Sequence, residues 1–262
     1  MTAAHDFTAA EMMTIAAARL LADGDVCFVG IGLPSAAANL ARLTHAPRIV
    51  LIYESGPIGA KPDVLPLSIG DGSLAETADT VVSTSEIFRY WLQGGHVTVG
   101  FLGAAQIDRF ANINTTVIGD YRRPATRLPG AGGAPEIANC AGKVILVMNQ
   151  TSRSFVEKVD FITSVGHLDG GDARKRLGLT GGGPVAVVTD LCLLEPDRVT
   201  RELTVTSLHP GITRQKVEAS TGWKLRFAPQ VSETAPPKSF ELETLRQLQR
   251  RTALAHGRAP AA

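Results

Sequence analysis

The stretch that decides the fold is residues 49–59, Ile-Val-Leu-Ile-Tyr-Glu-Ser-Gly-Pro-Ile-Gly. Its first four residues are aliphatic and mostly β-branched, which is typical of a short strand buried on both faces of a parallel sheet. Gly56, Pro57 and Gly59 end that strand at once. Glu54 therefore lies at the carboxyl end of a predicted strand, where open α/β sheets form their binding crevices.

Position alone leaves several roles open for Glu54. A carboxylate at a strand end can act as a base, a metal ligand, an ion-pair partner or a nucleophile, and structural ion pairs are common. The rest of the chain has to decide between these roles.

The composition indicates one large α/β domain over the 262 residues, with a core of about residues 8–230 and a C-terminal helix at 239–256. Hydrophobic residues make up 44% of the chain and aromatic residues 5%, so the core is built mainly from small aliphatic side chains. We expect a single open, mainly parallel sheet with helices on both faces. The net charge of +1 gives no electrostatic reason to expect binding to nucleic acid or to a membrane surface.

The cysteines and histidines predict no metal site. Cys27, Cys140 and Cys192 are widely spaced without a CxxC pair, and the six histidines form no ligand pattern. Cys27 and Cys192 lie in apolar runs and are expected to be unreactive core residues. The chain has no apolar run of 18 residues and no basic start of the signal-peptide kind, so we expect a cytoplasmic protein.

The region before residue 49 predicts a helix, strand, turn and helix in order. Thr8 and Glu11 have capping-box spacing and begin a first helix that ends at Gly24. A strand at 26–29 leads into Gly30-Ile31-Gly32 and an alanine-rich helix that runs to about residue 43. The turn lacks the third glycine of a dinucleotide fingerprint, so a tight turn beneath a substrate is favoured over a Rossmann cofactor site.

Later segments supply more strands and helices. Residues 62–79 are expected to form a loop, and the glycine-rich and charged residues 166–183 an exposed segment. Helices are expected at 83–92 and 213–220, and strands at 97–102, 144–148, 185–189 and 203–208.

Two polar or glycine-rich features follow strands in this later part. Gln106 comes just after the strand at 97–102, where it either bonds its own loop or faces a ligand. Gly130, Gly132 and Gly133 stand among four residues, so the loop either bends through positive φ or allows a close approach to its amides. Such amides at a helix start can hold a phosphate, a carboxylate or an oxyanion, although no P-loop lysine follows.

Together these stretches resemble the β-subunits of the class I coenzyme A transferases over about residues 8–256. The glutaconate CoA-transferase branch is the more similar one, because it carries Glu-Ser-Gly where the other branch carries Ser-Glu-Asn-Gly. Within that branch, residues 52–62 and 86–91 look most like the members that act on 3-oxoadipate. The motifs that carry the resemblance are Gly30-Ile31-Gly32-Leu33-Pro34, Glu54-Ser55-Gly56, Gly103-Ala104-Ala105-Gln106-Ile107-Asp108, Ile118-Gly119-Asp120-Tyr121 and Gly130-Ala131-Gly132-Gly133-Ala134.

The resemblance implies a reaction and its site. Glu54 would be the nucleophile that takes CoA from succinyl-CoA as a glutamyl thioester and passes it to 3-oxoadipate, in ping-pong order, during the degradation of aromatic compounds by the β-ketoadipate pathway. The amides of Gly132 and Gly133 would form the oxyanion hole. Arg122, Arg123 or Arg127 could hold a distal carboxylate. The residues that would bind substrate or CoA are Gly30, Gly32, Ser55, Gly56, Gln106 and Gly130.

The same resemblance implies partners and leaves alternatives. The chain would pair with an α-subunit in an α2β2 heterotetramer and would need no cofactor, since the CoA thioester is a substrate. Transfer to glutaconate or another dicarboxylate is one alternative, and a hydrolase or decarboxylase of the same fold that acts on CoA thioesters is another. A non-enzymic effector-sensing domain is a more distant alternative, which would rest on fold analogy alone.

Overall fold

The computed structural model of the chain describes residues 6–257, and these form two compact units. Residues 6–101 and 236–257 make up one, which we call the terminal unit. Residues 102–235 make up the other, the middle unit. The expected single domain stays a prediction.

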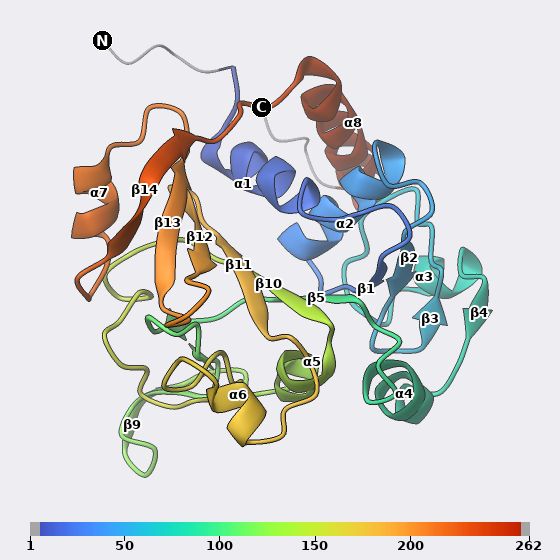
Figure 1. Cartoon of the computed structure of the whole chain (residues 1–262). Helices are drawn as coiled ribbons and strands as arrows, with labels where there is room; N and C mark the ends of the chain where they lie inside the picture. Colours follow the sequence, from blue (N-terminus) through green and yellow to red (C-terminus); the bar gives the residue numbers. More distant parts are fainter. Residues whose placement is uncertain (1–5, 258–262) are drawn as a thin grey trace. The chain divides into compact units, whose positions relative to one another are not determined.

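The strands of the terminal unit follow the order β5-β1-β2-β3-β4 (Figure 1). Strand β1 (Val26–Phe28) pairs in parallel with β2 (Val50–Ile52) on one side and β5 (Val99–Leu102) on the other. Strands β3 (Pro57–Ile58) and β4 (Thr80–Val81) extend the sheet by antiparallel pairing. The strand predicted from residues 49–52 is therefore confirmed as β2, beside a parallel neighbour.

Three helices of the terminal unit contact one another: α1 (Ala9–Ala18), α2 (Leu33–Leu43) and α8 (Ser239–Ala255) (Figure 1). The expected C-terminal helix is thus present as α8. The helix expected at 83–92 is also present, as the short α4 (Thr84–Glu86) followed by the π-helix η1 (Ile87–Leu92).

The segment 62–79 is not wholly a loop, contrary to the sequence-based expectation. It contains α3 (Gly72–Glu76), which begins where the Asp71 side chain accepts a hydrogen bond from the amide of Ser73. An aspartate at this position satisfies one of the amides that a helix start leaves without a partner. A five-residue helix is too short to show a hydrophobic period, so the capping residue was its main sequence signal.

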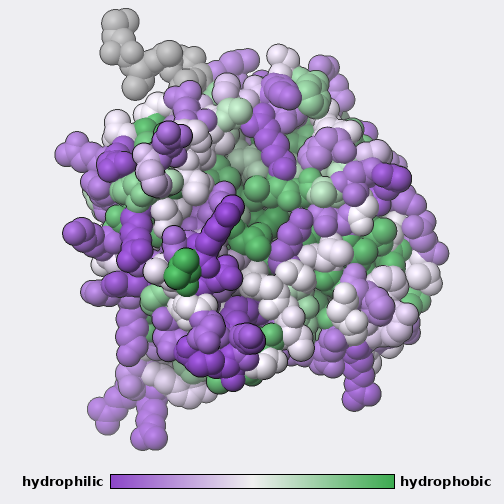
Figure 2. All heavy atoms as spheres, in the orientation of Figure 1, coloured by the Kyte–Doolittle hydropathy of each residue, from purple (hydrophilic) through white to green (hydrophobic). Residues whose placement is uncertain are grey.

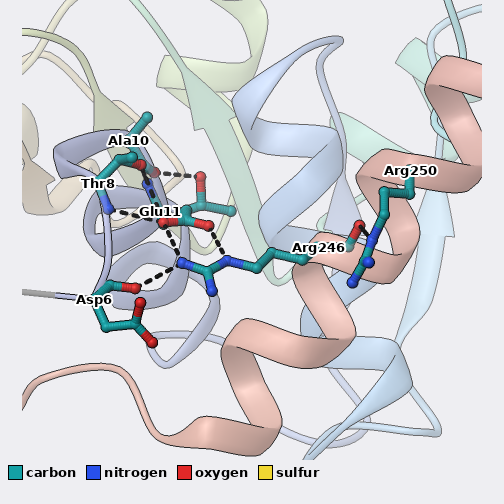
Figure 3. A network of polar contacts seen from close by, with 7 residues as sticks. Asp6, Thr8, Ala10, Glu11, Arg246 and Arg250 are labelled. Carbon is teal, nitrogen blue, oxygen red and sulfur yellow. Dashed lines mark hydrogen bonds and ion pairs between the residues drawn. The ribbon is translucent and has the colours of Figure 1, made fainter. Parts of the chain in front are cut away.

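Two ion pairs join α1 to α8. The Glu11 carboxylate accepts a hydrogen bond from the Thr8 amide, which completes the predicted capping box. It also accepts a hydrogen bond from Arg246 Nε at 2.6 Å (Figure 3). Arg19 donates from Nε to Glu241 at 2.8 Å. The hydrogen bond from Arg246 lowers the pKa of Glu11 below its ordinary value of 4.5.

The strands of the middle unit follow the order β14-β13-β12-β11-β10. Pairs β10–β11 and β13–β14 are parallel, whereas β11–β12 and β12–β13 are antiparallel. β12 and β14 were not expected from the sequence. The bounds are β10 (Lys143–Val147), β11 (Pro184–Val188), β12 (Cys192–Pro196), β13 (Leu203–Leu208) and β14 (Arg226–Glu233).

Two small hairpins and three short helices complete the middle unit. The hairpins pair β6 (Gln106–Ile107) with β7 (Ile113–Asn114), and β8 (Val117–Gly119) with β9 (Pro124–Arg127). The helices are α5 (Ala134–Cys140), α6 (Ala173–Arg176) and α7 (Arg214–Ala219), of which α7 was predicted. In the described part of the chain, no helix is both long and apolar enough to cross a membrane.

The expectation that residues 166–183 are exposed is wrong in part. His167 and Arg174 are buried, with exposed fractions of 4% and 8%. Both side chains form hydrogen bonds to backbone carbonyls. His167 Nε2 bonds the carbonyl of Pro184 at 2.8 Å, and the Arg174 guanidinium donates to the carbonyl of Gly166 at 2.8 Å. Glycine and charge in the sequence indicated a surface loop, but carbonyl acceptors let these polar groups be buried.

The cysteines are buried, as the apolar runs around two of them predicted. Burial raises the pKa of Cys192 to about 12. Because the thiolate is the reactive form, we expect no labelling of Cys192 by iodoacetamide at pH 8 in the folded protein and full labelling in guanidinium chloride. Mass spectrometry of the peptides measures this, and rapid native labelling of Cys192 would contradict its placement.

We also expect Glu11→Gln to lower the free energy of unfolding by about 1 kcal/mol at pH 7, because a charge-assisted hydrogen bond to Arg246 is weakened. A lowered folded-state pKa adds stability that is present above the ordinary value of 4.5 and is lost as the pH falls through the folded-state value. The difference between wild type and variant should therefore vanish in acid. Urea unfolding at several pH values measures it, with exposed Glu218→Gln as the control, and a difference that persists at low pH would contradict the assignment.

Candidate active site

Glu54 lies at the tip of the turn between β2 and β3. Tyr53 and Pro57 close this turn, since the Tyr53 amide donates to the Pro57 carbonyl at 3.0 Å. The Gly56 amide then donates back to the Tyr53 carbonyl at 3.0 Å. The Glu54 side chain is half-buried and makes no hydrogen bond or ion pair within the terminal unit. A carboxylate held in this way keeps its lone pairs available to a ligand.

Gly56 allows the turn to pack closely against the residue after β4. Its φ is +121°, and a Cβ at this position would lie 2.1 Å from the carbonyl oxygen of Val82. The Val82 amide donates to the Gly56 carbonyl at 3.1 Å, so the two backbones are in direct contact. Only glycine combines this φ with this approach. The adjacent Ser55 hydroxyl donates to the carbonyl of Ile69, so it holds the turn to the next loop.

Tyr53 anchors the other side of the turn. Its side chain is fully buried, and its hydroxyl lies 3.2 Å from Ser35 Oγ on α2. Asn39 donates to the Ser35 carbonyl at 3.0 Å, and Arg42 donates to Asn39 Oδ1 at 3.2 Å. Burial raises the pKa of Tyr53, so the hydroxyl stays protonated and can donate. The residue before the carboxylate is thus fixed by packing and by hydrogen bonds from one helix.

The Gly30–Gly32 turn lies at the same edge of the sheet as Glu54. The parallel register puts Phe28 beside Ile52, so the chain leaves β1 and β2 at corresponding positions. Gly32 is the N-cap of α2 with φ +81°, and a Cβ there would meet nothing within 4 Å. The positive φ explains this glycine, and the open space above it can admit a ligand. The structure therefore brings the predicted turn and the predicted carboxylate together.

Gln106, in the middle unit, has a structural role. Its amide Nε2 donates to Asp160 Oδ2 at 2.9 Å, while its oxygen accepts from Asn114 at 2.7 Å and from the Asp160 amide at 3.0 Å. Asp160 also accepts the Gly119 amide at 2.9 Å. These bonds favour the interpretation that Gln106 bonds its own loops, and a contact with CoA stays a prediction. Asp160 lies outside every motif, so sequence reasoning had no signal with which to find it.

The glycine loop bends through positive φ, which was one of the two interpretations of its glycines. Gly130 and Gly132 have φ of +104° and +51°, and Gly133 is the N-cap of α5 without a side-chain cap. Gly130 donates to the Thr115 carbonyl at 2.9 Å, which ties the loop to the residue after Asn114. Within the middle unit, the amides of Gly132 and Gly133 donate to no acceptor. They are therefore available to an oxyanion or another anion.

The arginines beside this loop differ from one another. Arg127 is engaged locally, because its guanidinium lies 4.8 Å from the ring centroid of Tyr121 and donates to the Tyr121 carbonyl at 2.7 Å. Tyr121 in turn stacks on Phe161 at 5.4 Å. Arg122 and Arg123 are exposed on the β8–β9 turn, where Asp120 accepts both of their amides. Either exposed guanidinium can reach a ligand more readily than that of Arg127.

The site residues thus fall into two groups. Glu54, Ser55, Gly56 and the Gly30–Gly32 turn belong to the terminal unit, and Gln106 with the glycine loop belongs to the middle unit. The expected convergence of the two groups stays a prediction. Among residues 6–257, no group of three or more His, Cys, Asp or Glu side chains could hold a metal ion.

We expect Gly56→Ala to be strongly harmful, because the new methyl group would lie 2.1 Å from the Val82 carbonyl oxygen at a φ that L-residues rarely adopt. The turn must shift, and Glu54 shifts with it. We expect a loss of about 2–4 kcal/mol in the free energy of unfolding, measured by urea denaturation. Gly72→Ala, where a Cβ meets nothing within 4 Å, is the control. Equal stabilities of the two variants would contradict this account of the turn.

Comparisons with known proteins agree on one family. The profile of the family described as Coenzyme A transferase matches residues 10–220. The chain is 70% identical over 247 residues to a 3-oxoadipate CoA-transferase subunit of Pseudomonas knackmussii, covering 94% of this chain and 95% of the relative. It is 29% identical over 228 residues to the cholesterol ring-cleaving hydrolase IpdB subunit of Rhodococcus jostii, covering 82% and 81%.

A solved structure supports the same assignment. The crystal structure of glutaconate coenzyme A-transferase from Acidaminococcus fermentans superposes with a TM-score of 0.86 at 33% identity, covering 92% of this chain and 94% of the other. This likeness confirms the expected open α/β fold with a mainly parallel sheet. The chain belongs to the coenzyme A transferase family.

Proposed function

We propose that the chain is the β-subunit of a CoA-transferase that moves CoA from succinyl-CoA to 3-oxoadipate in the degradation of aromatic compounds. The observation that carries the proposal is the unpaired Glu54 carboxylate on a rigid Glu-Ser-Gly turn at the carboxyl ends of parallel strands. The 70% identity to a relative named for 3-oxoadipate supports the choice of acceptor.

The chemistry uses Glu54 as the acyl carrier. Its carboxylate oxygen attacks the thioester carbonyl of succinyl-CoA, which gives a mixed anhydride and expels CoA as the thiolate. The thiolate then attacks the glutamyl carbonyl, forming a glutamyl-CoA thioester and releasing succinate. A carboxylate of 3-oxoadipate repeats these steps in reverse and leaves as 3-oxoadipyl-CoA. A thioester replaces a thioester, so the proposed reaction needs no bound cofactor.

Other site residues support these steps in the proposal. Each attack forms a tetrahedral oxyanion, which the amides of Gly132 and Gly133 would stabilise. In other enzymes, the loss of one such donor lowers kcat by about 10²–10³-fold. The Gly30–Gly32 turn beside Glu54 would line the path of the CoA arm. Arg122 or Arg123 would bind the distal carboxylate of the dicarboxylic acid through charge-assisted hydrogen bonds.

We propose an α-subunit as partner, in an α2β2 assembly in the cytoplasm. The similar proteins from Pseudomonas knackmussii and Rhodococcus jostii are each named as one subunit of an enzyme, which supports a second chain. The interface of such an obligate pair is expected to bury roughly 2,000 Å² or more. Co-purification with a separately tagged α-subunit tests this part of the proposal.

A CoA-thioester hydrolase is the second candidate, because the chain is also similar to a ring-cleaving hydrolase subunit. The two functions differ after the first step. A transferase holds CoA on Glu54 until an acceptor carboxylate arrives, whereas a hydrolase releases its product to water. Steady release of free CoA without acceptor would therefore favour the hydrolase.

We expect the complex, incubated with succinyl-CoA alone, to gain one CoA on the peptide that contains Glu54. Mass spectrometry should locate the adduct, and borohydride should trap it by reducing the thioester. Initial rates should follow ping-pong kinetics, since succinate leaves before 3-oxoadipate binds. Sequential kinetics without an adduct, in an active complex, would contradict Glu54 as the nucleophile.

The matched variants are Glu54→Gln, Glu54→Asp and Glu76→Gln. Glu54→Gln should abolish the adduct, and Glu54→Asp should lower kcat about 100-fold or more, because a shift of about 1 Å in a reacting atom can cost 10²-fold. Glu76 is an exposed residue at the end of α3 with no role in the proposed site, and its variant should keep wild-type rates. Steady-state kinetics measure the series, and near-normal turnover by Glu54→Gln would overturn the proposal.

A further inference from the structure

The middle unit contains a pocket that none of the roles above uses. Its volume is about 720 Å³, within the range of small-molecule sites. Three segments line it: residues 167–175, the glycine-rich residues 178–182, and the turn at 198–201 between β12 and β13. In Figure 2 the surface over α6, part of the first segment, is hydrophilic.

The lining of this pocket is strongly cationic. Arg174, Lys175, Arg198 and Arg201 all border it, and Asp172 is its one acidic lining residue. Asp172 forms an ion pair with Arg176, a residue outside the pocket that also pairs with Asp169. Four cationic residues thus face one carboxylate in the lining. Within the described part of the chain, Lys175, Arg198 and Arg201 form no ion pair. The positive charge at the pocket is therefore left unbalanced.

Arg174 adds a buried charge to this set. Its side chain is 8% exposed, and its guanidinium donates only to backbone carbonyls, including those of Gly166 at 2.8 Å, Ala138 at 3.0 Å and Gly181 at 3.0 Å. Carbonyl dipoles satisfy its hydrogen bonds but do not cancel its charge. A buried cation without an anion is costly, and proteins ordinarily pair such groups.

The positive field also reaches a neighbouring residue. Burial lowers the pKa of His167, and the charges of Arg174 and Arg201 lower it further. His167 therefore stays neutral near pH 7 and adds no charge of its own. Arg201 lines the same pocket as His167 and Arg174.

The backbone around the pocket is held in place. A Cβ at Gly182 would lie 2.3 Å from the Gly142 carbonyl oxygen, and one at Gly183 would lie 2.8 Å from Arg174 Nε. In the turn at 198–201, the amides of Val199 and Thr200 donate to the Asp197 carboxylate at 2.9 and 2.7 Å. This closes the turn that presents Arg198 and Arg201. Because the backbone of the pocket wall is already fixed, little of its conformational entropy is lost when a ligand binds.

We propose that this pocket binds the phosphate groups of a small molecule. Two guanidinium groups on one turn match the geometry of phosphate oxygens, and Lys175 supplies a further point charge. The volume accommodates more than one phosphate group together with the group that carries them. The phosphates can come from CoA itself or from a separate phosphorylated ligand, and the two sources differ in a binding experiment.

The test is calorimetric titration of the full chain, in complex with its α-subunit, with inorganic pyrophosphate. We expect binding that weakens as salt is raised. The double variant Arg198→Gln/Arg201→Gln should raise the Kd by a factor of at least about ten, while Arg153→Gln, an exposed arginine of the same unit outside the pocket, should not. Matched thermal unfolding of the three proteins shows that the fold is retained.

A second titration, with CoA, identifies the source of the phosphates. If the double variant weakens CoA binding by a similar factor, the pocket holds the phosphates of CoA. If CoA binding is unchanged while pyrophosphate binding is lost, the pocket takes a separate phosphorylated ligand. The proposal is overturned if wild type binds no pyrophosphate up to about 10 mM, or if the double variant binds it as well as wild type does. These readouts do not depend on turnover, so they stand apart from the test of Glu54.

Discussion

The parallel pairing of β1 with β2 is the constraint on which the Glu-Ser-Gly turn depends. Because Phe28 and Ile52 are in register, the chain leaves both strands at the same edge of the sheet. The Gly30–Gly32 turn and Glu54 are brought together there without any bond between their side chains. Position is thus set by backbone hydrogen bonds, and the carboxylate makes no local bond that a substrate would have to break.

The turn itself is fixed by packing on both sides of the carboxylate. Tyr53 is buried against α2 through Ser35, and Gly56 lies against the backbone of Val82. Glu54 is the position between these anchors that remains half-buried and unpaired. The role proposed for Glu54 requires this combination, because a carboxylate that attacks a thioester must be held firmly while its oxygens stay accessible.

Most of the terminal unit could be predicted from the sequence, because its signals are local. The aliphatic run of β2, the capping box of α1 and the glycine that begins α2 each act within a few residues. Apart from the short helix α3, which has a local cap, the features that escaped prediction depend on distant partners. β12 and β14 exist as strands because they pair with β13. The side chain of Gln106 is held by Asp160, and Arg174 can be buried because carbonyls from three separate segments accept its hydrogen bonds. The expected convergence of Glu54 with the glycine loop stays a prediction.

The terminal unit is assembled from both ends of the described chain, and this affects how it forms during synthesis on the ribosome. Helix α1 is made early, but α8, which supplies Glu241 and Arg246, is made only after the whole middle unit. At about 5–20 residues per second, the wait is on the order of ten seconds. During that time the face of α1 and α2 that α8 later covers is open to chaperones. The contiguous middle unit, residues 102–235, can meanwhile fold first, reversing the usual order from the N-terminus.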